Sequence, residues 1–422
     1  MTTNSTADRL HYLDWLRVLT VMLLVPFHGA LPFVAGYYWW VTSVQKNVAT
    51  QALVNVLDQY HMPLLFLIAG GAVWFSLSRR SGGEFMLERL KRLVVPAVFA
   101  ALAFVAANHF LSQQHYFYAD PVNQNLLRMN LLDPFGSYLQ HYPDILTNKL
   151  IPFTSGWNPG LLWFLWYLIF YTLVFFPLFL LVRRKGGRFT SWLAWFFEKP
   201  GAVFLLAIPI ALVRIYPPQP EAMMSIWTFQ TFQVFYFVLF FVFGFFLISE
   251  PRIRRGLEKT GPIAIVGGII TMTLFMLIVF PPGNEVLGPA FWERFGYGPG
   301  TTGNAIFLTL QAFNGWFWII GLIYLAKRFL NFSNRFLRYA NDAVLPFYIL
   351  HETSLVTVGY FVMQTDMAVG PKYAILVSGA FGMAVVLYEI IRRTNITRFA
   401  MGMRLKRRPV PADKGPGWLI AG

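Results

Sequence analysis

The chain has 422 residues, of which 56% are hydrophobic, 18% aromatic and only 13% charged, and its formal net charge is +15. Because an ordinary soluble domain is about one quarter charged, this composition excludes a soluble globular protein and indicates an integral membrane protein. In that class an excess of Lys and Arg is typical of cytoplasmic loops, so we do not expect nucleic-acid binding. The absence of cysteine excludes disulfides, thiolate nucleophiles and cysteine-ligated metals.

Long apolar runs predict an all-α, polytopic bundle of about ten transmembrane helices, since about 20 apolar residues cross the hydrocarbon core. The first run is too long for a signal peptide and ends in Tyr37, Tyr38, Trp39 and Trp40, aromatic residues typical of the outer membrane interface. The runs lie near residues 15–41, 60–78, 93–111, 160–182, 201–216, 227–249, 261–281, 304–326, 343–364 and 371–391.

Positive charges set the orientation of the bundle. Lys and Arg concentrate in every second loop and after the last run, whereas the alternate loops carry few. The basic loops are therefore expected in the cytoplasm, together with both termini, as in a multi-pass protein of the cell (inner or cytoplasmic) membrane. We expect one membrane domain over residues 1–393, with a basic cytoplasmic tail over 394–422.

Two outer loops, at about 112–159 and 281–304, are long enough to contribute to a site. The first is rich in Tyr, Asn, Gln and His, side chains that suit a polar, ring-shaped ligand. An interfacial cap on the bundle explains the same composition equally well. The second loop is rich in Gly and Pro and is expected to be irregular.

Ionisable residues inside the first run are the first candidates for function. The eleven positions from Arg17 to His28 return to within about 20° of one helical face and rise about 16 Å, so both side chains are expected to face one cavity at different depths. Asp14 can pair with Arg17 and orient its guanidinium group. Pro26 is expected to kink the helix beside His28. Alternatively, Arg17 is only the positive-inside anchor of the helix, and His28 is a buried structural residue.

A second histidine, His351, is expected at a depth close to that of His28 in the run 343–364. Two mid-membrane histidines from opposite ends of the chain suggest one common site, in which an imidazole could serve as general base. Glu352 adjoins His351 but is turned by about 100° around the helix, so it need not be a partner. His61, near the outer end of the second run, is expected at the interface.

Several stretches, in order along the chain, together carry a family resemblance. They are Tyr12–Arg17 (YLDWLR) followed by Pro26–His28 (PFH), Met62–Gly70 (MPLLFLIAG), Arg89–Arg92 (RLKR) followed by Pro96, Leu162–Leu165 (LWFL) and Tyr348–His351 (YILH). This set resembles the membrane acyltransferase-3 family, and the first two helices are closest in style to its glucan-succinylating branch, which is glucan biosynthesis protein C-like. The chain departs from the family at Ala69-Gly70-Gly71, where Ser-Gly-aromatic is usual.

The resemblance implies an acyl-CoA-dependent acyltransferase. Such an enzyme moves an acetyl, succinyl or similar acyl group from cytoplasmic acyl-CoA to a hydroxyl of an extracytoplasmic glycan or glycolipid. It also implies that Arg17 and His28 are the core catalytic pair, and that Arg89 and Arg92 bind the donor.

Further site residues complete the prediction. We assign His351 to the catalytic group, Asp14 to donor binding, and Trp163 and Tyr348 to acceptor binding. No metal and no permanently bound cofactor is expected. The expected partners are acyl-CoA, the acceptor and the lipid bilayer, and the pattern leaves open the oligomeric state.

A different class of protein also fits these residues. A transporter or flippase for a glycan or a small molecule could use two histidines and an arginine as a proton relay. The sequence has no matched pair of Gly/Pro-broken helices of the kind that marks inverted transporter halves. Consumption of a thioester would separate the two classes.

Overall fold

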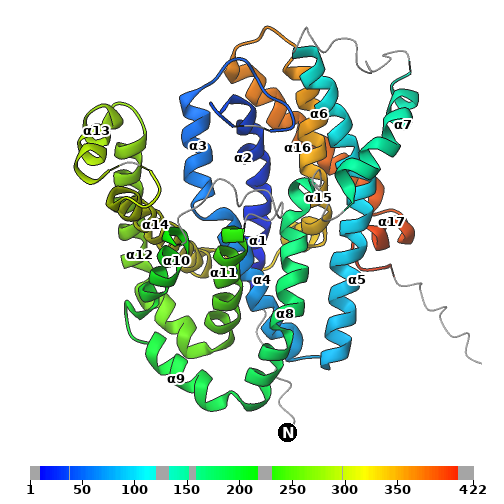
Figure 1. The fold of residues 1–422 in the computed structure, drawn as a ribbon. Helices are drawn as coiled ribbons and strands as arrows, with labels where there is room; N and C mark the ends of the chain where they lie inside the picture. Colours follow the sequence, from blue (N-terminus) through cyan, green and yellow to red (C-terminus); the bar gives the residue numbers. More distant parts are fainter. Residues whose placement is uncertain are drawn as a thin grey trace, which may run out of the picture.

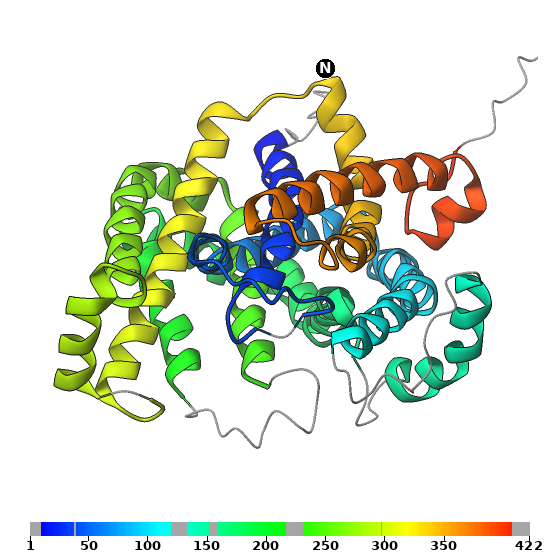
Figure 2. The same ribbon diagram turned by 90° about the horizontal axis from the view of Figure 1, so that it is seen from above.

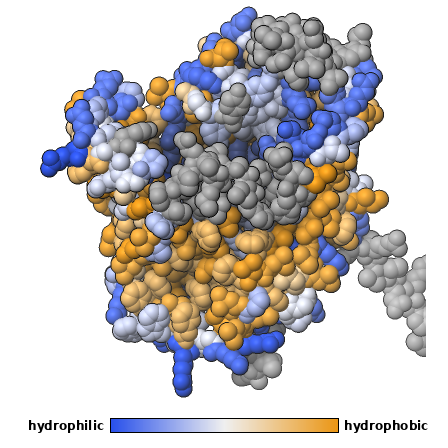
Figure 3. Space-filling model, viewed as in Figure 1, coloured by the Kyte–Doolittle hydropathy of each residue, from blue (hydrophilic) through white to orange (hydrophobic). Residues whose placement is uncertain are grey.

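The computed structural model of the protein describes residues 10–37, 39–119, 133–151, 158–216, 231–296 and 298–406. Over these ranges the chain forms helices and no β-strand, which confirms the predicted all-α bundle (Figure 1). Seen from above in Figure 2, the helices pack side by side around the first helix and the late helices of the chain. Figure 3 shows a hydrophobic band, with hydrophilic residues gathered at the two opposite ends of the molecule.

The helices follow one another through short turns. Their bounds are α1 His11–Met22, α2 Leu24–Ala30, α3 Val48–Asp58, α4 His61–Leu77, α5 Gly82–Ala100, α6 Ala106–Ala119, α7 Pro134–Ile145, α8 Trp163–Lys185, α9 Gly187–Phe197, α10 Ala207–Ile215, α11 Thr231–Ser249, α12 Pro251–Val279, α13 Gly283–Phe295, α14 Thr302–Phe329, α15 Arg335–Val362, α16 Val369–Ile391 and α17 Asn395–Ala400. Short 3₁₀ or π turns are η1 Leu31–Phe33, η2 Ala101–Val105, η4 Leu146–Leu150, η5 Gly160–Leu162 and η6 Ala202–Leu206.

Among the described residues, seven helical segments are long and apolar enough to cross a membrane, or up to eight if the bent pair α9 and η6–α10 forms one span. The sequence predicted about ten runs, and each corresponds to a helix. Two fall outside the seven or eight for physical reasons. The apolar part of α11 is short, and α15 carries Arg335, Arg338, Asp342 and Glu352, which interrupt its apolar character.

The first span breaks beside the predicted site. Helix α1 ends at Met22 and α2 begins at Leu24, with a turn at Leu23 between them. Pro26 explains the break, because it has no N–H to donate and its ring crowds the carbonyl of Met22, one turn earlier. The hydroxyl of Tyr373 donates a hydrogen bond to the carbonyl of Pro26 at 3.1 Å, which fastens α2 to α16.

Helices α4 and α11 cross at very close range. A Cβ atom at Gly70 would lie 1.9 Å from the carbonyl oxygen of Phe241, and one at Gly244 would lie 1.9 Å from that of Leu67. Each helix therefore presents a glycine to the backbone of the other, the device that lets membrane helices pack by direct contact. A Cβ at Gly71 would meet the side chain of Ile248 at 2.5 Å, so an aromatic residue next to Gly70 would not fit here.

We predict that Gly70→Ala destabilises the bundle. The added methyl group must displace the α11 backbone, at a cost of roughly 3 kcal/mol for overpacking. The measurement is the thermal unfolding midpoint of the purified protein, with Gly83→Ala as the matched control. Gly83 is also a helical glycine, but nothing lies within 4 Å of its missing Cβ. Equal midpoints for the two variants would contradict the packing interpretation.

The described part of the predicted tail includes a short helix. Helix α17 packs on α5, and the following Met401 is 0% exposed. A Cβ at Gly402 would lie 2.7 Å from Pro96 and 2.8 Å from Leu345. The chain after α16 therefore folds back on the bundle, while the domain boundary at residue 393 stays a prediction.

Candidate active site

His28 of α2 and His351 of α15 lie side by side inside the bundle. The Nε2 atom of His351 is 3.3 Å from the Nδ1 atom of His28, and the two ring centroids are 5.1 Å apart. His351 is 0% exposed, whereas His28 keeps some accessible surface. Two residues 323 positions apart in the chain thus form one pair, as expected from their similar depth.

The hydrogen bonds assign the ring protons of this pair. Nδ1 of His351 is 2.6 Å from the carbonyl oxygen of Tyr348, and Nδ1 of His28 is 3.0 Å from that of Leu24. A carbonyl only accepts, so in the neutral rings both Nδ1 atoms carry the proton. The Nε2 lone pair of His351 then faces the Nδ1–H of His28. The Nε2 atom of His28 is left with a lone pair, which is the atom required of a base.

Other helical histidines show which part of this geometry is specific. Nδ1 of His61 is 2.7 Å from the carbonyl of Leu57, and Nδ1 of His141 is 2.6 Å from that of Ser137. A bond to the carbonyl four residues earlier is therefore common to these rings and to His28. The contact with a second imidazole is what distinguishes His28. His61 is buried against Phe27, with ring centroids 4.4 Å apart, and its expected position at the membrane interface stays a prediction.

Arg17 and His28, the two predicted catalytic residues of the first span, both contact helix α15. Nη2 of Arg17 donates to Oδ1 of Asn341 at 2.6 Å, and eleven residues later His28 contacts His351. The two helices run in the same direction, so Arg17 and His28 face one partner helix at two depths, as the helical spacing predicts. Arg17 also pairs with Asp14, at 3.2 Å from Nη2 to Oδ1.

Arg89 lies in the first half of α5 and Arg92 near its middle, and the start of this helix is the end that the sequence predicts to be cytoplasmic. Nη1 of Arg92 is 3.7 Å from Oε1 of Glu88, whereas Cζ of Arg89 lies 5.5 Å from the centroid of the Phe85 ring. Arg89 interacts electrostatically with the guanidinium groups of Arg92, Arg17 and Arg80 and with the carboxylate of Glu88. Within the described ranges no carboxylate forms an ion pair with Arg89. The guanidinium groups of Arg17, Arg89 and Arg92 therefore gather, together with that of Arg80, on the expected donor side of the histidine pair.

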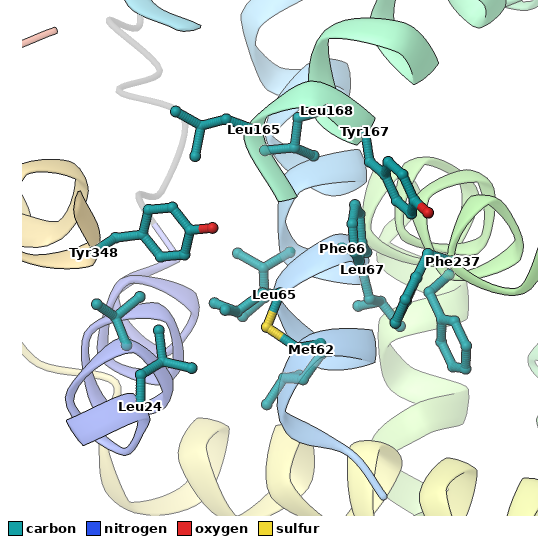
Figure 4. Packing of buried hydrophobic residues seen from close by; sticks show 14 of the residues in the cluster. Leu24, Met62, Leu65, Phe66, Leu67, Leu165, Tyr167, Leu168, Phe237 and Tyr348 are labelled. Atoms are coloured by element: carbon teal, nitrogen blue, oxygen red, sulfur yellow. The ribbon is translucent and has the colours of Figure 1, made fainter. Parts of the chain in front are cut away.

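Tyr348 borders the histidine pair. Its ring centroid is 5.9 Å from that of His351 and 5.4 Å from that of Phe164. Figure 4 shows the ring directed from α15 toward Leu65 of α4 and Leu165 of α8. Tyr348 is thus next to the histidine pair, and its contact with an acceptor stays a prediction.

Trp163 lies farther along the same interior. Its ring centroid is 5.2 Å from that of Phe237, 5.3 Å from that of Tyr167 and 6.1 Å from that of Phe66. These neighbours belong to the aromatic packing between α4, α8 and α11, and the ring contacts described for Trp163 do not include His28. Its role in acceptor binding stays a prediction.

The sequence predicts Tyr37, Tyr38, Trp39 and Trp40 at the membrane interface, but not all of the described rings among them face away from the bundle. Trp39 turns inward and stacks on His28, with ring centroids 6.3 Å apart and planes inclined by 24°. Trp40 is buried and only 8% exposed, whereas Tyr37 is exposed. Tyr38 lies outside the described residues. Trp39 therefore forms part of the wall of the site, and Trp40 packs in the interior next to it.

Hydrogen bonds to α6 hold this outer segment in place. Nε2 of His115 is 3.0 Å from the amide nitrogen of Thr42, and the hydroxyl of Tyr116 donates to the carbonyl of Trp39 at 2.5 Å. Nζ of Lys46 donates to Oγ1 of Thr42 at 2.9 Å, and partial burial lowers the pKa of this lysine. The Thr42 amide donates to His115, and Tyr116 donates to the Trp39 carbonyl, so two bonds tie the segment to α6.

Asn341 and Trp39 are site residues that sequence reasoning missed. Asn341 lies in the second turn of α15, after a basic loop, where a polar side chain is ordinary and gives no sign of a function. Trp39 belongs to an aromatic group that matches a membrane interface equally well. A signal for Asn341 was available: it precedes His351 by ten residues, nearly the spacing that separates Arg17 from His28.

Within the described residues, no group of three or more His, Cys, Asp or Glu side chains could hold a metal ion. No curated protein and no solved structure matches the chain. A family described as "Acyltransferase domain" matches residues 10–389, which contain all the predicted site residues. Since this match spans nearly the whole chain, the protein belongs to the acyltransferase-3 family and is a membrane acyltransferase.

Proposed function

We propose that the protein is an O-acyltransferase that acts across the cell's inner (cytoplasmic) membrane. It takes an acetyl, succinyl or similar acyl group from cytoplasmic acyl-CoA and transfers it to a hydroxyl of an extracytoplasmic glycan or glycolipid. The observation that carries the proposal is the His28–His351 contact at 3.3 Å, which leaves Nε2 of His28 as the basic atom. The resemblance to the glucan-succinylating branch favours succinyl-CoA and a glucan, a modification of the same kind as polysaccharide O-acetylation.

The histidine pair accounts for the proton transfers of the reaction. Nε2 of His28 takes the proton from the acceptor hydroxyl, whose oxygen attacks the thioester carbonyl carbon. The carbon–sulfur bond of the tetrahedral intermediate then breaks, and the CoA thiolate takes the proton back from His28. His351 accepts the Nδ1–H of His28 throughout, which holds the ring and stabilises its transient positive charge. The products are the ester and CoA thiol, so protons balance without exchange with solvent.

The arginines suit a donor that enters from the cytoplasm. Arg17 lies about 16 Å below His28 by helical rise, a distance that the slender pantetheine arm of CoA spans. The CoA phosphates would remain with Arg89 and Arg92, whose guanidinium groups bind phosphate oxygens in pairs. Asp14 and Asn341 orient Arg17 from two sides.

We predict that Arg89→Ala raises the KM for acyl-CoA by roughly tenfold, the effect of losing one charge-assisted hydrogen bond, with kcat nearly unchanged. Steady-state kinetics over a range of donor concentrations measures both parameters. The matched control is Arg252→Ala, which removes an exposed arginine at the start of α12. A similar KM in the two variants would mean that Arg89 is an ordinary cytoplasmic charge.

The test of the proposed function is release of CoA thiol by the purified protein, followed with a thiol-reactive dye. The chain contains no cysteine, so the protein adds no thiol signal of its own. Acetyl-CoA and succinyl-CoA are compared, each with and without a glucose oligosaccharide. We expect release with one donor, increased by the acceptor, and an ester on the recovered sugar. If neither donor is consumed under any of these conditions, the transporter class replaces the proposal.

A further inference from the structure

A second buried polar cluster lies beside the histidine pair, where α6 meets α15. Glu352 is 3% exposed, and Nδ2 of Asn108 donates to its Oε2 at 3.4 Å. Gly160 covers the carboxylate in a left-handed conformation, φ +53°, and a Cβ there would lie 3.2 Å from Oε2 of Glu352 and 2.9 Å from Trp40. An ionisable group at this depth is costly, which makes a function for it the first hypothesis.

Asn108 gives this cluster an unused hydrogen-bonding atom. The residue is 1% exposed, and its Oδ1 accepts no hydrogen bond from the described residues. Because the carboxylate can only accept, the amide nitrogen must face Glu352, and the oxygen must therefore point elsewhere. A buried amide oxygen without a donor loses the hydrogen bonds that water would give it in the unfolded chain, which is destabilising. The cluster thus holds one atom that a bound hydroxyl would satisfy.

Glu352 is not needed as a proton carrier for the histidines. It is turned by about 100° from His351 around α15, and the reaction returns its proton to the CoA thiolate. No proton has to leave toward the outer side, so a relay through Glu352 has nothing to carry. Binding and positioning are the remaining roles for a carboxylate at this place.

Two consecutive tryptophans join the cluster to the histidine pair. Trp39 stacks on His28. The next residue, Trp40, packs edge-on against His109, with ring centroids 4.8 Å apart, and lies with Glu352 around Gly160. On α15, Tyr348 lies one turn before Glu352 on the same helical face and also borders His351. Trp39, Trp40 and Tyr348 therefore connect the surroundings of Glu352 with the histidine pair.

We propose that Glu352, Asn108 and Trp40 form a binding site for the hydroxyl groups of a sugar ring. The inference rests on the proposed function and deepens it, because it assigns the acceptor a place beside the histidine pair. The carboxylate accepts from two neighbouring hydroxyls, the amide oxygen of Asn108 accepts from a third, and the indole packs on the apolar face of the ring. A hydroxyl outside these contacts is presented to Nε2 of His28.

The test is binding of a β-linked glucose trisaccharide, measured by saturation-transfer NMR in polymer-bounded nanodiscs. This preparation contains no sugar-headed detergent that could compete. We expect saturable binding by the wild type, loss of at least roughly tenfold in affinity for Glu352→Gln and for Asn108→Leu, and unchanged binding for Glu285→Gln. Glu285 is an exposed carboxylate on α13 and serves as the matched control. Trp40→Phe is the further variant if Asn108→Leu does not fold.

Kinetics separates a positioning role from a structural one. In Glu352→Gln we expect a higher KM for the acceptor, with the KM for the donor and the slow hydrolysis of the donor by water unchanged. The absence of saturable sugar binding by the wild type, or equal affinity in Glu352→Gln, would overturn the inference. Sugar binding without any CoA release would instead contradict the proposed acyl transfer and leave the sugar site standing.

Discussion

Replacing His28 by alanine is expected to lower kcat for acyl transfer by roughly 10³-fold, the usual contribution of a positioned general base. The reason lies in the tautomer that the hydrogen bonds impose. Leu24 and His351 both engage Nδ1 of His28, so Nε2 is the atom with a lone pair to take the hydroxyl proton. The measurement is the initial rate of CoA release and of ester formation at saturating donor and acceptor.

A matched histidine makes this result specific. His141 is also buried and makes the same bond to the carbonyl four residues earlier, but it packs on Phe110, outside the site. We expect His141→Ala to retain most of the wild-type rate, and both variants to keep the thermal midpoint within a few degrees. A His28→Ala variant that folds and turns over normally would remove His28 from the mechanism.

Removal of His351 should have the second largest effect. We expect His351→Leu to lower kcat by about 100-fold with little change in either KM, because the Nδ1–H of His28 loses an acceptor when the ring becomes positively charged. Leucine fills a similar volume, which limits damage to packing. His351→Gln restores an oxygen near the position of Nε2 and should recover about tenfold of the loss.

The comparison of these two variants distinguishes positioning from packing. A purely structural His351 would give equal rates for the leucine and glutamine variants, or a loss that follows the thermal midpoint. A His351 that reacts directly with substrate would not be rescued by glutamine. The expected order of kcat is wild type, then glutamine, then leucine.

Local chemistry in the sequence determined much of this protein. The lengths of the apolar runs predicted the helical bundle, and the lack of an N–H in Pro26 predicted the break before His28. The helical period placed Arg17 and His28 on one face, and both contact α15. Each of these properties depends on residues within a few turns of one helix, so the amino-acid sequence alone is sufficient to infer it.

Tertiary structure decided which side chains of other helices these helical faces contact. Nothing near Trp39 in sequence indicates that it turns from the interface onto His28, because hydrogen bonds from the distant α6 fold it back. The sequence shows only that Glu352 is turned away from His351 around the helix. The packing of α6 against α15 is what brings Asn108 to Glu352 as a hydrogen-bond partner. Spacing along a helix gives depth and direction, whereas the identity of the facing side chain depends on how separate helices pack.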